Sequence, residues 1–560
     1  MTIPAFNPPE DPVLLARYVD LAYQASDTSR LRVSIPKMCR NLHELDHAHI
    51  KRLLVIATKT DDAELAHAIA QEVLRRNVID YRTAVDIFTL VSAEVDHEKR
   101  REIQVVLEGK LKDVDQARLR VSGAFFEFGS EAAYREARRL FPKVRTPREA
   151  AFLADAVAKS GRPQLASRFL RFCTRRWPRS AQVRNAMIMA FLAGGHINAA
   201  QSYLDRQGDR CTPRDLVPMQ LRVLIHAGKL KSAGKLIEET RRPGRGKANP
   251  TESLMVFLGL GDIELAKKTV SDHFPHERAH FRATHLGSLL NELEIYQSAG
   301  SLSGSQSRDE VESYFAAASR VVDDWATEND ELGTDSFDGT RRILQYWDAP
   351  EPGFAVSELM ATWKNIPGWS YLRLDRAEAM EWLLATFGAK YVQAFRLARN
   401  VAEESDFLRL CLLYEEGGLY VDADDKRIAP PDELLHGTSG AMLFKEPFGA
   451  LANNIMYSPP RHPVFAKAIE LSLAALLARE SDSTWFKTGP GLMTRATALF
   501  ILDDPAGAEE HLTLRPYFEL RQYVQPHIRA PHKVSQNYWN APRNRIANAF
   551  VKALGKPLPG

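Results

Sequence analysis

Three aspartates stand at the end of one apolar segment, in GGLYVDADD at residues 417–425. If the apolar residues form a strand, Asp422 and Asp424 point to the same side, with Cα atoms roughly 6 to 7 Å apart. Two carboxylates that close repel each other unless a cation or solvent lies between them. A hard divalent cation fits, because it takes one or two carboxylates and completes its shell with phosphate oxygens. The pattern therefore predicts a site for a metal and a substrate phosphate, with a solvated turn and a calcium loop as alternatives.

A helix is expected directly before this segment, in SDFLRLCLLYEE at residues 405–416. Its apolar residues follow the spacing of one buried stripe: Phe407, Leu410, Cys411 and Tyr414. At about 100° per residue, Asp406 and Arg409 fall beside each other at the edge of that stripe. They are either a surface ion pair worth about 0 to 1 kcal/mol or two hydrogen-bonding groups directed at a polyhydroxyl ligand. Gly417 and Gly418 then end the helix, because left-handed backbone at this position favours glycine.

Strands and helices alternate in the part of the chain that contains these residues. Five strands are expected from apolar or alternating runs: RRILQYW (341–347), SYLRL (370–374), GLYVDAD (418–424), GAMLFKE (440–446) and NNIMYS (453–458). This alternation indicates an α/β domain from about residue 338 to 540. Asp422 and Asp424 then emerge at the carboxyl end of a strand, where open α/β sheets bind ligands. A metal there would neutralise the charge that develops on a departing nucleoside diphosphate.

Residues 1 to about 290 read as consecutive helices, and a repeat occurs within them. A glycine is followed five residues later by an alanine in GRPQLA, GHINAA, GKLKSA and GDIELA, every 33 or 34 residues from Gly161 to Gly261. Four positions after each alanine stands an aliphatic residue: Leu170, Leu204, Ile237 or Val270. We expect helical hairpins in which the glycine turns the chain, the alanine lets two helices approach and the aliphatic residue fills the seam. The pattern resembles tetratricopeptide (TPR) repeats over about residues 145–275, with a non-repetitive helical bundle as the alternative.

The bulk composition argues against several kinds of partner. The 74 basic and 71 acidic residues among 560 leave a net charge of +3, which gives no support for a nucleic-acid or anionic-membrane partner. Four scattered cysteines without a CxxC pair fit a reducing cytosol. The sequence starts without a signal peptide, and its apolar runs stay below the roughly 18 residues that span a bilayer. We expect no transmembrane segment and a bacterial, cytoplasmic protein, either free or peripheral to a membrane.

Two segments match the HExxH pattern of zinc proteases: HELDH at residues 43–47 and HERAH at residues 276–280. On a helix, two histidines four residues apart could bind one zinc ion. The inner positions, however, carry Asp46 and Arg278, where such proteases have uncharged side chains. We interpret both segments as chance matches on charged helix faces, with a structural or adventitious metal as the remaining alternative.

The segment SDFLRLCLLYEEGGLYVDADD at residues 405–425 resembles the core motif of DXD-containing glycosyltransferases of the GT-A fold. The similarity is greatest to the sugar-binding-region family that includes fungal Golgi mannosyltransferases and bacterial polysaccharide enzymes. Other family segments are matched in the same order along residues 338–540: RRILQYW, TWKNIPGWSYLRLD, NNIMYSPPRHPVF, KTGPGLMTRA and, more loosely, HKVSQNYW. The order and spacing of these segments make the resemblance specific.

The resemblance implies a role for the charged residues of the motif. Asp424 would bind a divalent metal, Mn²⁺ or Mg²⁺, directly. Asp422 would contact ribose and sugar, or bind the metal through water. Asp406 and Arg409 would bind hydroxyls of the donor sugar. These four are the expected catalytic residues. The family is similar to retaining enzymes in which no protein nucleophile is firmly established, so the resemblance implies no nucleophile here.

The resemblance also implies residues that bind the rest of the donor. Trp347 would stack on the base, with Tyr346 as the competing choice, and Asn454 would line the sugar pocket. His462 is expected to be structural. Three C-terminal residues would complete the metal and diphosphate shell: the metal ligand His532 and the donor ligands Ser535 and Trp539.

The resemblance implies a metal-dependent hexosyltransferase that uses a nucleotide-sugar donor, retains anomeric configuration and acts on a polysaccharide, glycolipid or protein acceptor. The expected domains are a TPR-like helical array (1–290), a linker and connecting helix (291–337), a GT-A glycosyltransferase domain (338–540) and a C-terminal tail (541–560). The array is expected to hold a protein partner, because helical solenoids present a concave binding face. The alternative is a non-catalytic scaffold whose GT-A domain binds a nucleotide sugar or is inactive.

Overall fold

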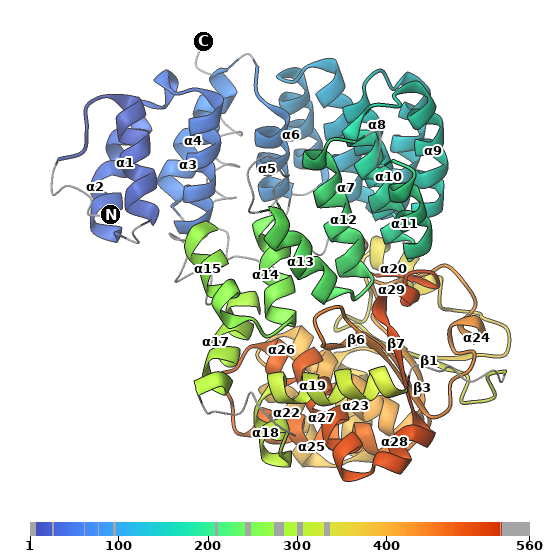
Figure 1. The fold of residues 1–560 in the computed structure, drawn as a ribbon. Helices are drawn as coiled ribbons and strands as arrows, with labels where there is room; N and C mark the ends of the chain where they lie inside the picture. Colours follow the sequence, from blue (N-terminus) through green and yellow to red (C-terminus); the bar gives the residue numbers. More distant parts are fainter. Residues whose placement is uncertain are drawn as a thin grey trace. The chain divides into compact units, whose positions relative to one another are not determined.

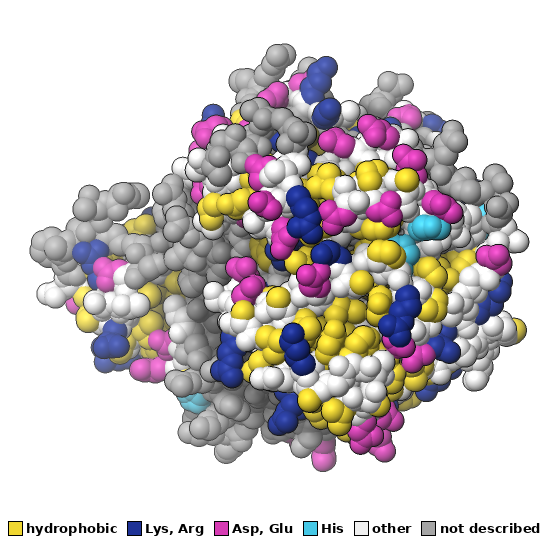
Figure 2. All heavy atoms as spheres, turned by 90° about the horizontal axis from the view of Figure 1, so that it is seen from below, with side chains coloured by type: hydrophobic (Ala, Val, Ile, Leu, Met, Phe, Trp, Pro, Cys, Tyr) yellow, Lys and Arg dark blue, Asp and Glu magenta, His cyan; other side chains and the backbone are white. Residues whose placement is uncertain are grey.

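The computed structural model describes residues 7–24, 27–60, 62–76, 78–92, 97–207, 211–240, 248–273, 285–298, 306–329, 336–526 and 528. They fall into two compact units, one ending at Ser160 and the other running from Gly161 to Ile528. Within these ranges, every helix is too short or too polar to serve as a membrane span. On the face seen in Figure 2, basic, acidic and hydrophobic side chains are interspersed rather than separated into regions of one kind.

The first unit is built from helices in the part that the structure describes (Figure 1). Side chains cap several of them: Asp27 accepts from the Arg30 N–H at 3.0 Å, and Asp62 accepts from the Leu65 N–H at 2.9 Å, which satisfies amides that the helix leaves free. Apolar residues from Leu15 to Leu119 share one core. The helices are α1 (Pro12–Gln24), α2 (Thr28–Arg40), η1 (Leu42–Glu44), α3 (His47–Thr60), α4 (Ala63–Arg75), α5 (Tyr81–Ser92), α6 (His97–Gly109), α7 (Asp113–Leu140), η2 (Phe141–Lys143) and α8 (Pro147–Lys159).

The HELDH segment of this unit does not form one helix. His43 belongs to the short 3₁₀ helix η1, whereas α3 begins at His47. The expectation that both histidines lie on one helix face is therefore wrong, and the i, i+4 placement that a zinc site of this type needs is missing. The second match, at residues 276–280, lies outside the described residues.

The second unit begins with a run of helices that contains the repeated pattern. The repeated glycines all have left-handed backbone, with φ of +76°, +71°, +68° and +68° at Gly161, Gly195, Gly228 and Gly261. The alanines that follow are fully buried: Ala166, Ala200, Ala233 and Ala266. The predicted glycine turns and close helix contacts are confirmed, and the resemblance to TPR repeats stays a prediction. The helices are α9 (Pro163–Arg176), α10 (Ala181–Ala193), α11 (Ile197–Asp205), α12 (Pro213–His226), α13 (Leu230–Thr240), α14 (Pro250–Gly259), α15 (Ile263–His273) and α17 (His285–Ser298).

A mixed six-stranded sheet forms the centre of the remainder of this unit, in the order β2-β1-β3-β6-β5-β7. Strand β1 pairs in parallel with β2 and β3, and β5 pairs in parallel with β7, whereas β6 is antiparallel to both β3 and β5. A separate two-stranded ribbon joins β4 to β8. The strands are β1 (Arg342–Tyr346), β2 (Ser370–Leu374), β3 (Gly418–Val421), β4 (Lys426–Arg427), β5 (Ala441–Lys445), β6 (Leu451–Ser458), β7 (Leu512–Pro516) and β8 (Val524–Gln525).

Side chains of the central strands alternate between two cores. Tyr420 points into a core that it shares with α19, α23, α25 and α27, whereas Leu419 and Val421 point into the core on the other face. The helices of this part are α18 (Arg308–Ser313), α19 (Phe315–Glu328), α20 (Phe354–Ala361), α21 (Arg376–Thr386), α22 (Ala389–Leu397), α23 (Val401–Glu416), α24 (Pro431–Leu434), α25 (Pro463–Leu477), α26 (Thr484–Lys487), α27 (Pro490–Asp503), α28 (Pro505–His511) and α29 (Tyr517–Leu520).

All five strands expected from the sequence occur, as β1, β2, β3, β5 and β6. Helices separate most of them and cover the sheet, which confirms an α/β arrangement for this part of the chain. Strands β4, β7 and β8 are additional to the predicted set. The GT-A topology itself is taken up below as part of the proposed function.

Candidate active site

The acidic segment is a turn rather than the end of a strand. β3 ends at Val421, and residues 422–425 form a β-turn in which the Asp425 N–H donates to the Asp422 carbonyl at 3.0 Å. The Asp422 N–H donates to the Asn454 carbonyl of β6 at 2.8 Å, so the sheet holds this residue although the strand has ended. The expected extension of the strand to Asp424 is wrong. Asp422 still follows Tyr420 on the side of the sheet that α23 covers.

Two glycines make the corner between α23 and β3. Helix α23 ends at Glu416, and Gly417 and Gly418 have φ of +61° and +108°. A Cβ on Gly417 would lie 2.7 Å from the Pro460 nitrogen, and one on Gly418 would lie 2.5 Å from the Arg342 carbonyl oxygen. Both the backbone conformation and the close packing therefore require glycine. The predicted helix end is confirmed.

Asp406 and Arg409 are buried under the sheet, with 6% and 4% of their surfaces exposed. Asp406 Oδ1 lies 3.3 Å from Arg409 Nη2 and accepts a hydrogen bond from Asn453 Nδ2 at 2.9 Å. Its Oδ2 accepts from Thr488 Oγ1 at 2.9 Å. Burial raises the pKa of Asp406, and Arg409 opposes this shift. The alternative of a surface ion pair is wrong, since both groups are withdrawn from water.

Arg409 connects the helix to the acidic turn. Its Nη2 lies 3.1 Å from Asp422 Oδ1 and donates to Ser405 Oγ at 2.8 Å, and its Nη1 donates to the Asn453 carbonyl. The guanidinium carbon stands 4.6 Å from the centre of the Tyr420 ring, a distance suited to a cation–π contact. Burial lowers the pKa of Arg409, but the nearby acids, Asp422 foremost, outweigh burial and leave that pKa raised. The side chain therefore stays charged.

Asp422 is the most accessible of these three residues, with 30% of its side chain exposed. Its Oδ1 accepts from the Tyr420 hydroxyl at 3.2 Å and pairs with Arg409. Its Oδ2 accepts no hydrogen bond from the residues that the structure describes. Burial, opposed by Arg409 and reinforced by the neighbouring Asp424 carboxylate, raises the pKa of Asp422 to about 6. Arg409 therefore offsets only part of the effect of burial on the Asp422 carboxyl.

Asp422 and Asp424 fit a divalent cation in chemistry and number. Carboxylate oxygens are the ligands that Mg²⁺ and Mn²⁺ prefer, and one or two of them are enough when phosphate and water complete the shell. Across the described ranges, no group of three or more His, Cys, Asp or Glu side chains could hold a metal ion by itself. The remaining ligands must therefore come from a substrate, from water or from elsewhere in the chain. Three predicted contributors lie outside the described residues: His532, Ser535 and Trp539.

The third aspartate has a different environment from the other two. Asp425 is 3% exposed, its Oδ2 accepts from Asn454 Nδ2 at 2.6 Å, and its carbonyl accepts from Trp363 Nε1 at 2.9 Å. Asp425 therefore stabilises the turn. The Asn454 amide, which was expected to line the sugar pocket, is directed at Asp425 here, and its contact with a sugar stays a prediction.

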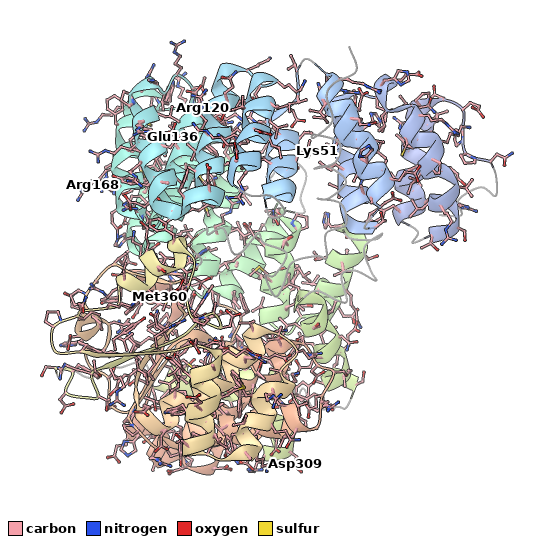
Figure 3. All side chains as sticks on the ribbon, turned by 180° about the vertical axis from the view of Figure 1, so that it is seen from behind. Lys51, Arg120, Glu136, Arg168, Asp309 and Met360 are labelled. Atoms are coloured by element: carbon pink, nitrogen blue, oxygen red, sulfur yellow. The ribbon has the colours of Figure 1, made fainter. Side chains whose placement is uncertain are left out.

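The two aromatic residues at the end of β1 differ in accessibility. Tyr346 is buried, and its hydroxyl donates to Glu404 Oε2 at 3.0 Å, while the other oxygen of Glu404 pairs with Arg376 Nε at 2.9 Å. Trp347 is only partly buried and packs on a small cluster next to the acidic turn: Val356, Met360 (Figure 3) and Ala423. Of the two, only Trp347 is partly exposed, and this difference in burial favours it over Tyr346 as the base platform.

His462 begins α25 and is buried, with 4% of its surface exposed. Its Nδ1 accepts from the Val464 N–H at 3.3 Å, and its Nε2 lies 2.9 Å from the His511 carbonyl. These partners suit a neutral imidazole that carries its proton on Nε2. Burial lowers the pKa of His462 to about 4, which keeps it neutral. The hydrogen bonds of the ring go to residues outside the acidic turn, and the imidazole caps helix α25.

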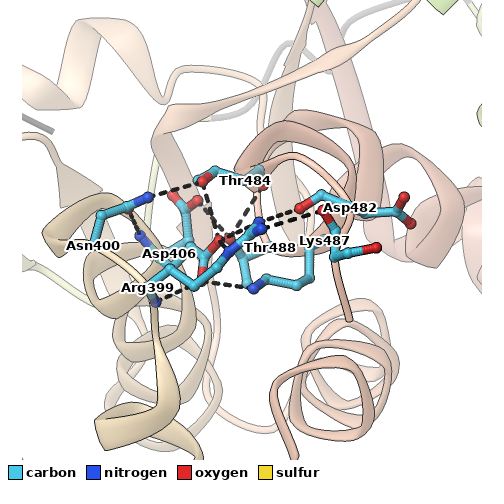
Figure 4. A network of polar contacts seen from close by, with 9 residues as sticks. Arg399, Asn400, Asp406, Asp482, Thr484, Lys487 and Thr488 are labelled. Atoms are coloured by element: carbon cyan, nitrogen blue, oxygen red, sulfur yellow. Dashed lines mark hydrogen bonds and ion pairs between the residues drawn. The ribbon is translucent and has the colours of Figure 1, made fainter. Parts of the chain in front are cut away.

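Sequence reasoning missed the residues that hold Asp406 in place. Asn453 and Thr488 bind its two carboxylate oxygens, and a buried network surrounds Thr488 (Figure 4). The available signal was that both residues lie in segments predicted to resemble the family, NNIMYS and KTGPG, and that resemblance assigns them no role. The structure thus brings Asp406, Arg409 and Asp422 into direct contact, places Asp424 and Trp347 beside them, and turns Asn454 to Asp425.

Comparison with known proteins agrees with this geometry. Residues 339–440 match the family model described as a glycosyltransferase sugar-binding region containing a DXD motif. A mannosyl phosphorylinositol ceramide synthase of Saccharomyces cerevisiae is 29% identical over 135 residues, which are 24% of this chain and 33% of the yeast protein. The chain thus spans about a third of the length of this curated relative.

A solved structure of the PaToxG glycosyltransferase covers 43% of this chain and 95% of its own, at 14% identity and a TM-score of 0.24. A similarity this weak does not establish a common fold. The matched residues 339–440 include β1, the Asp406–Arg409 pair and the Asp422-Ala423-Asp424 triplet. The predicted resemblance is confirmed over residues 339–440, which are similar to a glycosyltransferase sugar-binding region containing a DXD motif.

Proposed function

We propose that the chain is a glycosyltransferase that moves a hexose from a nucleotide-sugar donor to an acceptor, with a divalent metal at Asp422 and Asp424. One observation carries the proposal. Arg409 bridges Asp406 at 3.3 Å and Asp422 at 3.1 Å, so the helix with the sugar-binding residues and the turn with the DXD triplet share one site. This contact lies within the segment that matches the family model.

In this proposal, each residue binds a different part of the donor. Asp424 and Asp422, the latter through Oδ2, hold the metal. The metal in turn binds the diphosphate. A divalent ion at this place supplies charge neutralisation for a departing nucleoside diphosphate. Trp347 stacks on the base, because its ring adjoins Ala423 between the two aspartates. Asn454 is proposed to line the sugar pocket next to them.

Arg409 and Asp406 orient the sugar. The guanidinium is fixed by contacts on several sides, and a fixed donor costs little reorganisation when it binds a hydroxyl. Asp406 Oδ2 accepts one hydrogen bond from Thr488 and keeps a second lone pair for a sugar hydroxyl. Neither residue is suited to act as a nucleophile, because Arg409 is a cation and Arg409, Asn453 and Thr488 hold the two oxygens of the Asp406 carboxylate. We propose retention of configuration on the basis of the family resemblance.

The remaining features of the proposal follow from the rest of the chain. The mixed sheet is proposed to be a GT-A core over residues 338–540, and the helices of residues 1–290 a TPR-like array that holds a protein partner or acceptor. The name of the yeast relative includes a mannosyl group, so mannose is the first sugar to test. Polysaccharides, glycolipids and proteins are the proposed acceptor classes, met at the cytoplasmic side of a bacterial cell.

Donor hydrolysis tests the proposal directly. The purified chain is incubated with UDP- and GDP-linked hexoses, with and without Mn²⁺, and release of the nucleoside diphosphate is measured. We expect metal-dependent release from at least one donor. If no donor is hydrolysed and none changes the melting temperature, the non-catalytic scaffold is the correct reading.

A matched pair of variants tests the site. Asp424→Asn is expected to reduce turnover about a hundredfold or more, since a metal contributes several kcal/mol to the barrier. Asp324→Asn makes the same chemical change at an exposed position of α19 and should leave turnover unchanged. Equal turnover in Asp424→Asn and wild type would remove Asp424 from the site while leaving the activity in place.

A further inference from the structure

A second ion pair lies behind the candidate site, and both of its side chains are withdrawn from water. Glu403 is 0% and Lys487 2% exposed, and Glu403 Oε2 lies 2.7 Å from Lys487 Nζ. The family resemblance gave neither residue a role. Burying two charges costs several kcal/mol unless the geometry is good and further hydrogen bonds satisfy the remaining atoms. Such a pair therefore needs a structural reason.

The surroundings of Glu403 satisfy its carboxylate completely. Oε1 accepts from Arg399 Nε at 3.0 Å and from Thr484 Oγ1 at 3.1 Å, and Oε2 accepts from the Arg399 N–H at 2.9 Å in addition to Lys487. Asn400, which caps α23, donates to the Thr484 hydroxyl at 3.1 Å. With this many partners, Glu403 has little capacity left for a ligand. The network fixes α26 against the first turn of α23 (Figure 4).

This connection reaches Asp406 through the next residue of the chain. Thr488 follows Lys487 directly and is fully buried. Its hydroxyl lies 2.9 Å from Asp406 Oδ2 and 3.2 Å from the Thr484 carbonyl, so the shorter contact is with the carboxylate. Glu403 and Asp406 stand three residues apart on one face of α23. Two adjacent residues of one segment thus bind two neighbouring carboxylates of one helix.

We infer that Lys487 and Thr488 are positioning residues for Asp406. The Glu403–Lys487 pair fixes the segment, and the Thr488 hydroxyl fixes Asp406 Oδ2 so that its free lone pair is directed at a donor hydroxyl. Asn453 and Arg409 occupy only Oδ1, so among the described residues Thr488 sets the second oxygen. This inference rests on the proposed function, and it extends the donor site to a segment about eighty residues further along the chain.

Thr488→Val tests the inference with little change in shape. It removes the hydroxyl and should lower kcat/KM for donor hydrolysis about tenfold, since one hydrogen bond to a charged group is lost. Affinity for UDP or GDP with Mn²⁺ should stay as in wild type, because the acidic turn is untouched. Thr488→Ser keeps the hydroxyl and should restore turnover. A purely structural role of Thr488 predicts a different result. It would not combine unchanged nucleotide binding and lowered turnover in Thr488→Val with restored turnover in Thr488→Ser.

Thr497→Val is the matched control. Thr497 is also fully buried, on α27, and its hydroxyl has no hydrogen-bond partner among the described residues. This variant should keep wild-type turnover. For the ion pair, the double variant Glu403→Gln/Lys487→Met removes both charges together and avoids leaving one of them unpaired in the interior. We expect it to lose turnover about as much as Thr488→Val while retaining nucleotide binding.

The outcomes separate this inference from the proposed function. If wild type hydrolyses a donor and both Thr488→Val and the double variant keep wild-type kcat/KM, the positioning role is wrong and the glycosyltransferase proposal stands. If wild type hydrolyses no donor, the proposed function fails and the positioning role fails with it. Loss of nucleotide binding in Thr488→Val, with serine giving no rescue, would also overturn the positioning role.

Discussion

Gly195 is expected to be a structural contact point between the repeated helices and the sheet part of the second unit. It turns the chain between α10 and α11 with φ of +71°, and a Cβ placed on it would lie 2.5 Å from the Phe518 carbonyl oxygen. Gly228 makes the same turn between α12 and α13 with φ of +68°, but has no heavy atom within 4 Å of that position. The two glycines share a conformation and differ in packing.

Alanine at the two positions therefore separates conformational strain from steric overlap. Left-handed backbone costs an alanine about 1–2 kcal/mol, so Gly228→Ala should lower the free energy of unfolding by about that amount. Gly195→Ala carries the same cost and also pushes a Cβ into a carbonyl oxygen that cannot rotate away. Overpacking of this kind adds about 1–3 kcal/mol. It also disturbs the hydrogen bond that Gln525 Nε2 donates to the Ala193 carbonyl at 3.1 Å.

Thermal unfolding and hydrogen exchange check the prediction together. Gly195→Ala should lower the melting temperature clearly more than Gly228→Ala. Amide exchange should also quicken at residues 517–525 only in Gly195→Ala, because α29 and β8 lie there. Since β8 pairs with β4, which directly follows Asp425, the loss of protection should reach Lys426. Equal melting temperatures and unchanged exchange at residues 517–525 would refute the reasoning.

Two further predictions concern the base platform and the buried imidazole. Trp347→Ala should weaken nucleotide binding by about 1–3 kcal/mol through loss of stacking. Tyr346→Phe should keep that affinity and lower the free energy of unfolding by about 1–2 kcal/mol, because Glu404 loses a donor. Calorimetric titration with UDP or GDP compares the affinities of the two variants, and weaker binding by Tyr346→Phe than by Trp347→Ala would place the base on Tyr346. Burial lowers the pKa of His462 to about 4 in the folded chain, from an ordinary 6.5. Above pH 6.5 the neutral imidazole therefore contributes up to about 3 kcal/mol to the free energy of unfolding, and this contribution is lost as pH falls through 4. His462→Asn keeps a cap without this titration, and the stability difference between wild type and variant in urea unfolding should shrink from pH 7 to pH 4; a constant difference would contradict the assignment.

The strands that carry the site could be predicted from the sequence because their burial is periodic. In β3, Leu419 and Val421 face one core and Tyr420 the other, so the alternation in the sequence is the alternation in the fold. The same pattern continues into Ala423 and Asp424, yet the strand stops at Val421. The stop depends on the bond from Asp425 back to Asp422 and on the Asn454 side chain, and periodicity contains no information about such partners.

Contacts within the site were harder to predict the farther apart their residues lie along the chain. The Asp406–Arg409 pair follows from helical spacing, and the glycine corner explains why Asp422 comes near it. The bond from Thr488 to Asp406 spans 82 residues and has no local signal. The depth of burial was also missed. The helix around Asp406 is buried on nearly every side, its charged residues Glu403 and Glu404 included, so the polar pair looked like the edge of a stripe when it lies inside the core.

The three aspartates of the turn can now be distinguished by what neutralises each of them. Asp425 is buried and accepts a hydrogen bond from the Asn454 amide, so it stabilises the turn. Asp422 shares one guanidinium, that of Arg409, with Asp406. One guanidinium thus serves two carboxylates, and burial, together with the neighbouring Asp424 carboxylate, raises the pKa of Asp422. A divalent cation offsets this cost without protonating a carboxylate. Binding of Mn²⁺ should therefore stabilise the folded chain even without a donor, and Asp424→Asn should lose that stabilisation.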